Sequence, residues 1–127
     1  MALAAKALPI AGKRGIVLTT AVLRAADRLG LSAGHMAKVI GVSPATVSRM
    51  RRGGWVLEDG SKPFELAALL VRVFRSLDAI AGGDEAVVRS WMTGVNTALG
   101  GRPADKIRTI AGLMDVIAYL DARRAIV

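Results

Sequence analysis

The sequence contains no cysteine, a single histidine and few aromatic residues, and each scarcity excludes a class of protein. Without cysteine there is no disulfide framework, no thiolate metal site and no cysteine nucleophile, which fits a reducing compartment such as the cytoplasm. His35 has no partner at metal-ligand or catalytic spacing, and the glycines form no phosphate-binding motif. We therefore expect a cytoplasmic protein that is not an enzyme and has no metal, no cofactor and no small-molecule substrate.

A long apolar run is also missing. Arg72 and Arg75 interrupt the best candidate, so no stretch approaches the roughly 20 apolar residues that cross a bilayer. The opening segment is a poor secretion signal because Lys6 interrupts its apolar part and basic residues follow where a cleavage site should be. We expect no membrane partner, and we interpret residues 1–15 as a flexible arm.

Acidic residues are scarce in the first half of the chain. Of the net charge of +8, residues 1–62 carry ten Lys or Arg against three Asp or Glu, whereas residues 63–127 carry eight against seven. A basic first half indicates a polyanionic partner, because each phosphate that is neutralised releases a condensed counterion. The nearly neutral second half needs another explanation.

Alanine and aliphatic residues dominate what is present, and they favour helices over strands. Apolar residues recur at intervals of three and four along most of the chain, which predicts an all-α fold. Serine, proline and glycine mark the predicted ends of helices. The expected helices are 18–29, 33–40, 44–51, 63–81, one from residue 85 towards Leu99, and helical segments from Pro103 onwards.

The segment from Ala33 to Met50 has the pattern of a helix-turn-helix. Two helices cross closely when the first has a small residue facing the turn, here Ala37, and the turn has a glycine, here Gly41. Met36, Ile40, Val47 and Met50 supply the interior contacts. The segment resembles the Xre or Cro/C1 type of helix-turn-helix, and we assign residues 16–62 to this DNA-binding region.

The second helix of such a unit lies in the major groove and places its first residues against base edges. We expect Thr46, Ser48 and Arg49 to contact bases, because hydroxyls suit either base pair and arginine binds guanine or phosphate. Further expected DNA contacts are Lys38, Arg51 and Arg52 on phosphates, with Ser43 beside them at the start of the helix. Alternatively, these arginines only form a solvated face.

The last 50 residues resemble the toxin-binding domain of MbcA/ParS/Xre antitoxins. The matching elements are Trp91, Asn96, Leu99-Gly100, Pro103, Thr109, Gly112, Val116 and Leu120, while Val95 replaces a proline that is frequent in that family. Each element also has a structural explanation. Trp91 is typical of a core residue, and Asn96 and Gly100 are typical of a turn. Gly112 would allow another backbone to approach closely. Thr109 suits a break between two short helices.

The resemblance implies an all-α antitoxin with the toxin-binding and dimerisation region at residues 63–127. Its partner would be a RES-domain toxin, which is similar to ADP-ribosyltransferases and acts on NAD, and the end of the antitoxin would cover the toxin's active site. The segment implied is Asp121, Arg123, Arg124, Ala125, Ile126 and Val127. Alternatively, this segment is a frayed basic tail.

The resemblance also implies autorepression, in which the helix-turn-helix binds operator DNA of the protein's own operon. Readers of this type work as two-fold dimers over half-sites about 34–36 Å apart, so we expect a homodimer and a hetero-oligomer with the toxin. Two alternatives remain. One is a stand-alone transcriptional repressor with a C-terminal dimerisation domain, and the other is an interaction module whose helix-turn-helix no longer meets DNA.

Overall fold

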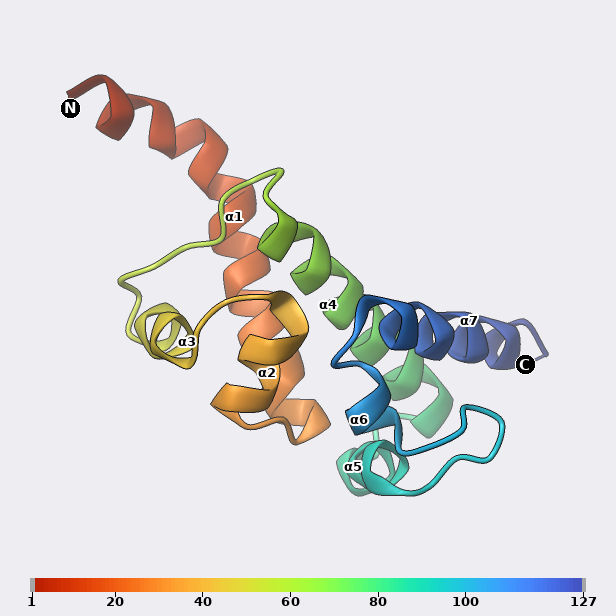
Figure 1. Cartoon of the computed structure of the whole chain (residues 1–127). Coiled ribbons are helices and arrows are strands. Elements are labelled where there is room, and N and C mark those ends of the chain that lie inside the picture. The colour runs from red at the N-terminus through yellow and green to blue at the C-terminus, as the bar shows by residue number, and fades with distance from the viewer. Residues whose placement is uncertain (1, 127) are drawn as a thin grey trace.

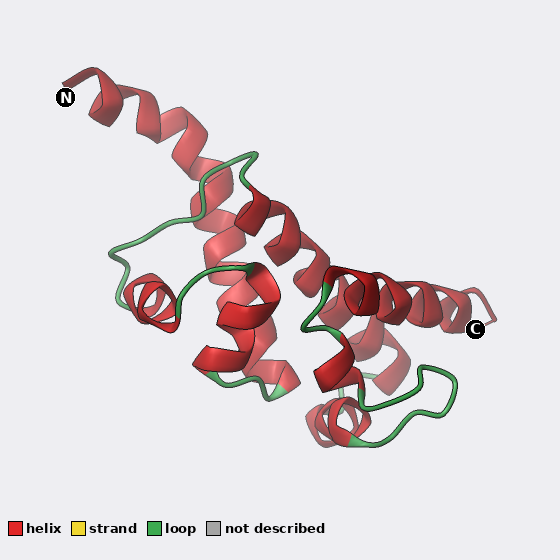
Figure 2. Cartoon of the chain, viewed as in Figure 1, coloured by secondary structure: helices red, strands yellow, loops and turns green. Residues whose placement is uncertain are grey.

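The computed structural model describes the backbone of residues 2–126 and the side chains of residues 12–125. Within this part the chain is helical and has no strand, which confirms the all-α prediction (Figures 1 and 2). One isolated β-bridge joins Asn96 and Gly101. The helices are α1 (Ala2–Leu29), α2 (Ala33–Ile40), α3 (Pro44–Arg51), α4 (Lys62–Ala81), α5 (Glu85–Thr93), α6 (Pro103–Lys106) and α7 (Ile110–Ile126).

Helix α1 begins at Ala2, well before the predicted start at Leu18. Apolar periodicity marks only the part of a helix that packs on a core, whereas an alanine-rich stretch has a high intrinsic helix propensity of its own. The prediction of a flexible arm at residues 1–15 stays a prediction. The side chains before residue 12 lie outside the described residues.

Helix α4 is the centre of the fold. It packs against α1 and α2 from the first half of the chain and against α5 and α7 from the second (Figure 1). Leu66, Leu70, Val73 and Leu77 form its buried stripe, and a single hydrophobic core runs through both halves. The two halves are therefore packed as one body.

A buried hydroxyl fastens the connector between α3 and α4 to α1. Thr19 donates a hydrogen bond to the carbonyl of Gly15 at 2.6 Å and accepts one from the amide of Leu57 at 3.0 Å. The connector approaches so closely that a Cβ atom on Gly15 would lie 2.1 Å from the Leu57 carbonyl oxygen. Only glycine permits this contact.

Helix α5 ends at Thr93 and does not continue towards Leu99 as predicted. The amide of Leu99 donates to the side-chain oxygen of Asn96 at 3.2 Å, and Gly100 has a φ of 76°. A side chain that bonds to nearby backbone competes with helical hydrogen bonding, so Asn96 closes the turn that was predicted for it, and the helix ends earlier than predicted. The hydrogen bonds of this turn decide where the helix ends, although apolar residues continue towards Leu99.

Candidate functional site

Helix α3 lies at the edge of the molecule, away from α5, α6 and α7 (Figure 1). Ser43 caps it by accepting a hydrogen bond from the amide of Thr46 at 3.0 Å, and Pro44 occupies the first turn. These local features start the helix where the sequence predicted. Val47 and Met50 are buried against the core. The exposed positions of this segment are Ser43, Pro44, Ala45, Ser48, Arg49, Arg51 and Arg52.

Thr46 is placed differently from its predicted role on a base edge. It is only 8% exposed, its hydroxyl lies 3.0 Å from that of Ser43, and it accepts a hydrogen bond from Nη2 of Arg49 at 3.1 Å. A threonine in the first turn of a helix turns back towards the cap instead of outward. In this arrangement Thr46 orients Arg49, and the hydroxyl that faces solvent is that of Ser48.

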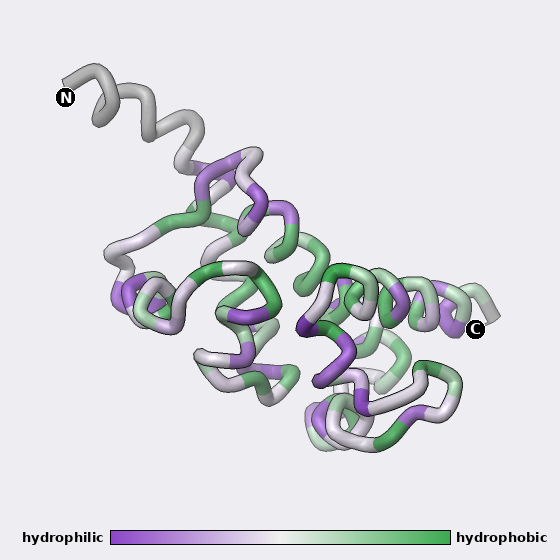
Figure 3. The backbone as a smooth tube through the Cα atoms, viewed as in Figure 1, coloured by the Kyte–Doolittle hydropathy of each residue, from purple (hydrophilic) through white to green (hydrophobic). Residues whose placement is uncertain are grey.

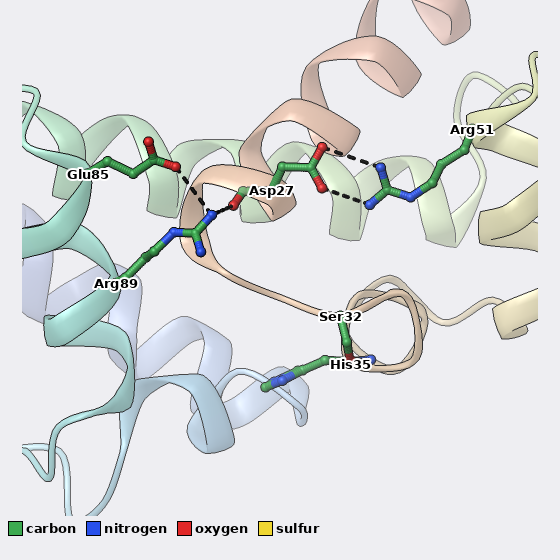
Figure 4. Close-up of polar contacts among 6 residues, drawn as sticks. All are labelled: Asp27, Ser32, His35, Arg51, Glu85 and Arg89. Carbon is green, nitrogen blue, oxygen red and sulfur yellow. Dashed lines mark hydrogen bonds and ion pairs between the residues drawn. The ribbon is translucent and has the colours of Figure 1, made fainter.

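Arg51 is bound within the protein. Its guanidinium donates two hydrogen bonds to the Asp27 carboxylate on α1, at 2.8 and 3.3 Å (Figure 4). These hydrogen bonds, together with the charge of Asp27, raise the pKa of Arg51 above its ordinary value. The pair ties the end of α3 to the end of α1. The predicted contact of Arg51 with a phosphate stays a prediction, and it would require the exposed pair with Asp27 to open.

Lys38 near the end of α2 and Arg52 at the end of α3 remain exposed. Within the described side chains neither forms an ion pair. Figure 3 shows hydrophilic stretches on both α2 and α3. This part of the predicted DNA surface has cations that are available to an external anion.

Polar contacts of Arg89 and of His35 join the helix-turn-helix to the second half of the chain, and none of them was predicted. Arg89 on α5 donates to the main-chain oxygen of Asp27 at 2.8 Å and pairs with Glu85 at 3.3 Å (Figure 4). The half-buried His35 on α2 has Nε2 2.5 Å from the carbonyl oxygen of Ala104 on α6. Both contacts link residues more than sixty positions apart, so no local pattern could have indicated them.

The residues of the second motif shape a corner between α5, α6 and α7. Thr109 accepts a hydrogen bond from the amide of Gly112 at 3.1 Å and so caps the start of α7. A Cβ atom on Gly112 would lie 1.9 Å from the carbonyl oxygen of Lys106 at the end of α6. Pro103 is buried at the first position of α6. The α6–α7 corner therefore depends on a glycine, at the place where the sequence predicted a close approach.

Trp91 lies at the rim of the core. It is half-buried and stacks on Tyr119 of α7, with 6.0 Å between ring centroids. The guanidinium of Arg123 lies 5.6 Å from the centre of the Tyr119 ring. An aromatic pair of this kind joins α5 to α7 and carries a cation at its outer edge.

The predicted tail segment is part of α7 and packs on α4. Asp121 forms an ion pair with Arg72, and Arg124 donates to the buried Ser76 hydroxyl at 3.2 Å. The alternative of a frayed tail is therefore wrong for residues 121–125. The side chain of Ile126 and all of Val127 lie outside the described residues.

The outer face of α7 has five exposed apolar side chains around one exposed carboxylate, that of Asp115. Ile110 is 60% exposed and Met114 is 45% exposed, and Ala111, Ala118 and Ala122 are also exposed. A surface helix normally turns mainly polar and charged side chains towards solvent. We call these five side chains the α7 face.

No cluster that could hold a metal ion occurs among the described residues. In the same part of the chain, no helix is long and apolar enough to cross a bilayer. The exposed features that remain as candidates are the basic surface of α2 and α3 and the α7 face.

Two family models match the chain. Residues 10–72 are similar to the antitoxin Xre-like helix-turn-helix domain, and residues 76–125 are similar to the antitoxin Xre/MbcA/ParS C-terminal toxin-binding domain. A search against curated proteins gives no match. Each matched segment contains one of the candidate surfaces: α3 lies within the first, and the five residues of the α7 face lie within the second.

Proposed function

The chain belongs to the Xre/MbcA/ParS family of antitoxins, and from that premise we propose that it inhibits a RES-domain toxin through the α7 face and represses its own operon. The observation that carries the proposal is the exposed apolar surface of α7 inside the segment matched to a toxin-binding domain. Apolar surface left uncovered on a folded protein marks an interaction site.

The proposal assigns the end of α7 a specific task. Asp121 and Arg124 hold the last turns of the helix against α4, so Arg123 and Ala125 are projected from a fixed support. Together with Ile126 and Val127, they would cover the active site of the toxin. A rigid support lowers the ordering cost of binding compared with a free tail.

For DNA binding, the proposal rests on the exposed cations of α2 and α3. Ser48 and Arg49 are the base-reading residues, with Ser43, Lys38 and Arg52 on the backbone of the operator. Thr46 supports Arg49, and Arg51 supports α3 through Asp27. Operator binding by a two-fold dimer would then place one α3 in each half-site.

The test of toxin inhibition uses co-expression with the neighbouring RES-domain toxin. Met114→Glu places a charge in the centre of the α7 face and is expected to release toxin activity and abolish co-purification. The matched control is Val87→Glu, because Val87 is an apolar residue of α5 with a similar exposed fraction, 49%. Growth, NAD content and co-purification are measured for both variants. Full protection by the Met114 variant would contradict the proposed interface.

A repressor that uses the α7 face only for dimerisation is the second candidate, because an uncovered apolar helix can equally pack on a second copy. Sedimentation analysis of the Met114→Glu variant separates the two. A dimer that is lost together with operator binding favours the repressor. An unchanged oligomeric state with lost toxin binding favours the antitoxin.

A further inference from the structure

A groove of about 460 Å³ runs between α1 and α4, on residues that neither proposed surface uses. Its floor and walls are apolar and come from both helices: Val17, Leu18, Ala21, Phe64, Ala68 and Val71. Val17 is 70% exposed, and the neighbouring Ile16 is 55% exposed, so the apolar surface continues beyond the groove. Two parallel rows of side chains with a furrow between them have the shape that accepts a third helix.

Cations stand at both ends of this groove. Lys13 and Arg14 lie at one end, where the Arg14 guanidinium is 5.6 Å from the centre of the Phe64 ring, and Arg75 lies at the other. Phe64 and Arg75 are eleven residues apart on α4. The distance between them along the helix axis is therefore about 16 Å, or three helical turns. The spacing defines where an occupant would carry its charges.

These cations are largely uncommitted. Arg14 has one long contact with Asp59, at 3.5 Å, and its side chain is 72% exposed. Among the described side chains, Lys13 and Arg75 pair with no carboxylate. An acidic occupant would therefore gain charge pairing without displacing an existing one, apart from the exposed Arg14 contact.

The charge of the chain argues against a second copy as the occupant. If two copies packed groove to groove, Lys13, Arg14 and Arg75 of one copy would lie near the same cations of the other. An external partner with the opposite charge has no such penalty. The observations favour an acidic segment whose apolar side fits the floor.

We propose that the α1–α4 groove is a docking site for an acidic amphipathic helix of another protein, with its apolar stripe on Ala68 and Val71 and carboxylates about three turns apart facing Lys13 and Arg75. The site is separate from the α7 face and from α3, so it leaves toxin binding and operator binding independent of its occupant. Docking of this kind would recruit a third component to the protein.

The test uses a fluorescein-labelled helical peptide of about 18 residues, with leucines on one side and two glutamates three turns apart. A control peptide has lysine in place of each glutamate. Fluorescence anisotropy with the full chain is expected to show at least about fivefold tighter binding of the acidic peptide at low salt, and the difference is expected to shrink as salt is added.

Variants locate the binding. Arg75→Glu is expected to lower affinity for the acidic peptide and raise it for the lysine peptide, while Arg102→Glu, a change of an exposed arginine elsewhere, leaves both unchanged. Ala68→Gln is expected to weaken binding by placing a polar group on the floor. Equal binding of both peptides, or binding insensitive to Arg75 and Ala68, would overturn the proposal. So would sedimentation showing that Ala68→Gln dissociates a dimer, because the occupant would then be a second copy.

Discussion

Gly112 shows how one small residue sets the geometry of the toxin-binding half. The carbonyl of Lys106 occupies the space that any other side chain would need, and the glycine allows α6 and α7 to meet at a sharp corner. Thr109 caps α7 at the same corner. The position of the α7 face relative to α5 therefore depends on these two residues.

We predict that Gly112→Ala lowers the free energy of unfolding by about 1–3 kcal/mol, because the new Cβ atom would collide with backbone that cannot move independently. Denaturant titration measures the loss. Gly34→Ala is the matched control: Gly34 is an exposed residue within α2 and a Cβ atom added there would meet open space, so the alanine is expected to stabilise by up to about 1 kcal/mol. Equal effects at the two glycines would contradict this account.

Arg51 and Arg52 are neighbours in the sequence, yet the structure gives them different surroundings. Asp27 binds Arg51 with two hydrogen bonds, whereas Arg52 is exposed. The Asp27–Arg51 pair is itself well exposed, so its contribution to stability is expected to be small, about 1 kcal/mol or less. Its main effect is to fix the end of α3 on α1.

We predict that Arg52→Ala reduces the slope of log affinity for operator DNA against log salt by about 1, because one phosphate contact is lost. Arg51→Ala is expected to leave this slope nearly unchanged, since its guanidinium is held by Asp27. Binding titrations at several salt concentrations measure both slopes. A larger effect for Arg51 than for Arg52 would show that Arg51 leaves Asp27 in the DNA complex.

Helix α7 contributes to the core on one side and forms the α7 face on the other, and the sequence pattern did not show which residues belong to which side. Its inner side, with Leu113, Val116 and Leu120, belongs to the core, and its outer side is the α7 face. Near its end, Asp121 and Arg124 fasten it to α4. A deletion of residues 121–127 would therefore remove both the proposed blocking residues and the anchors of the helix.

Two deletions separate these effects. Removing residues 125–127 keeps both anchors and is expected to release toxin activity while operator binding and the melting temperature stay nearly unchanged. Removing residues 121–127 is expected to lower the melting temperature as well, because the contacts with Arg72 and Ser76 are lost. Co-expression growth tests and thermal unfolding measure the outcomes. Complete protection by the shorter deletion would place inhibition on the α7 face alone.

The protein as a whole is organised around α4, which supplies core residues to both matched segments. The predicted boundary between residues 62 and 63 falls where α4 begins, so a cut there would remove the main packing partner of α1 and one of the two main partners of α2. Arg89 and His35 add polar contacts across the same junction. Folding of the two halves is therefore coupled.

We predict that a fragment of residues 1–62 is largely unfolded, because α1 would lose its main packing partner and α2 would keep only its contacts with α3. A fragment of residues 1–81 is expected to be helical with a cooperative melt, since it restores α4. Circular dichroism of the two fragments and of the full chain measures the difference. A cooperative melt of the shorter fragment would show that the helix-turn-helix region folds alone.

Most helices were predictable because their ends are marked locally. Ser43 and Pro44 start α3, Gly41 ends α2, and Gly82 ends α4, each by a backbone requirement that acts within a few residues. The start of α1 and the end of α5 were mispredicted. In the first, helix propensity acts without a core-facing pattern, and in the second the turn bonds of Asn96 outweigh apolar periodicity.

The sequence alone determined the helical class, the helix-turn-helix register and the separation of a basic half from a neutral half, because periodicity, capping and charge are local or additive properties. Only the tertiary structure decided which side chains face outward. Thr46 turns inward to its cap, Arg51 pairs with Asp27, and Met114 stays uncovered. These outcomes depend on how helices distant in the chain pack around α4, and no local pattern contains that information.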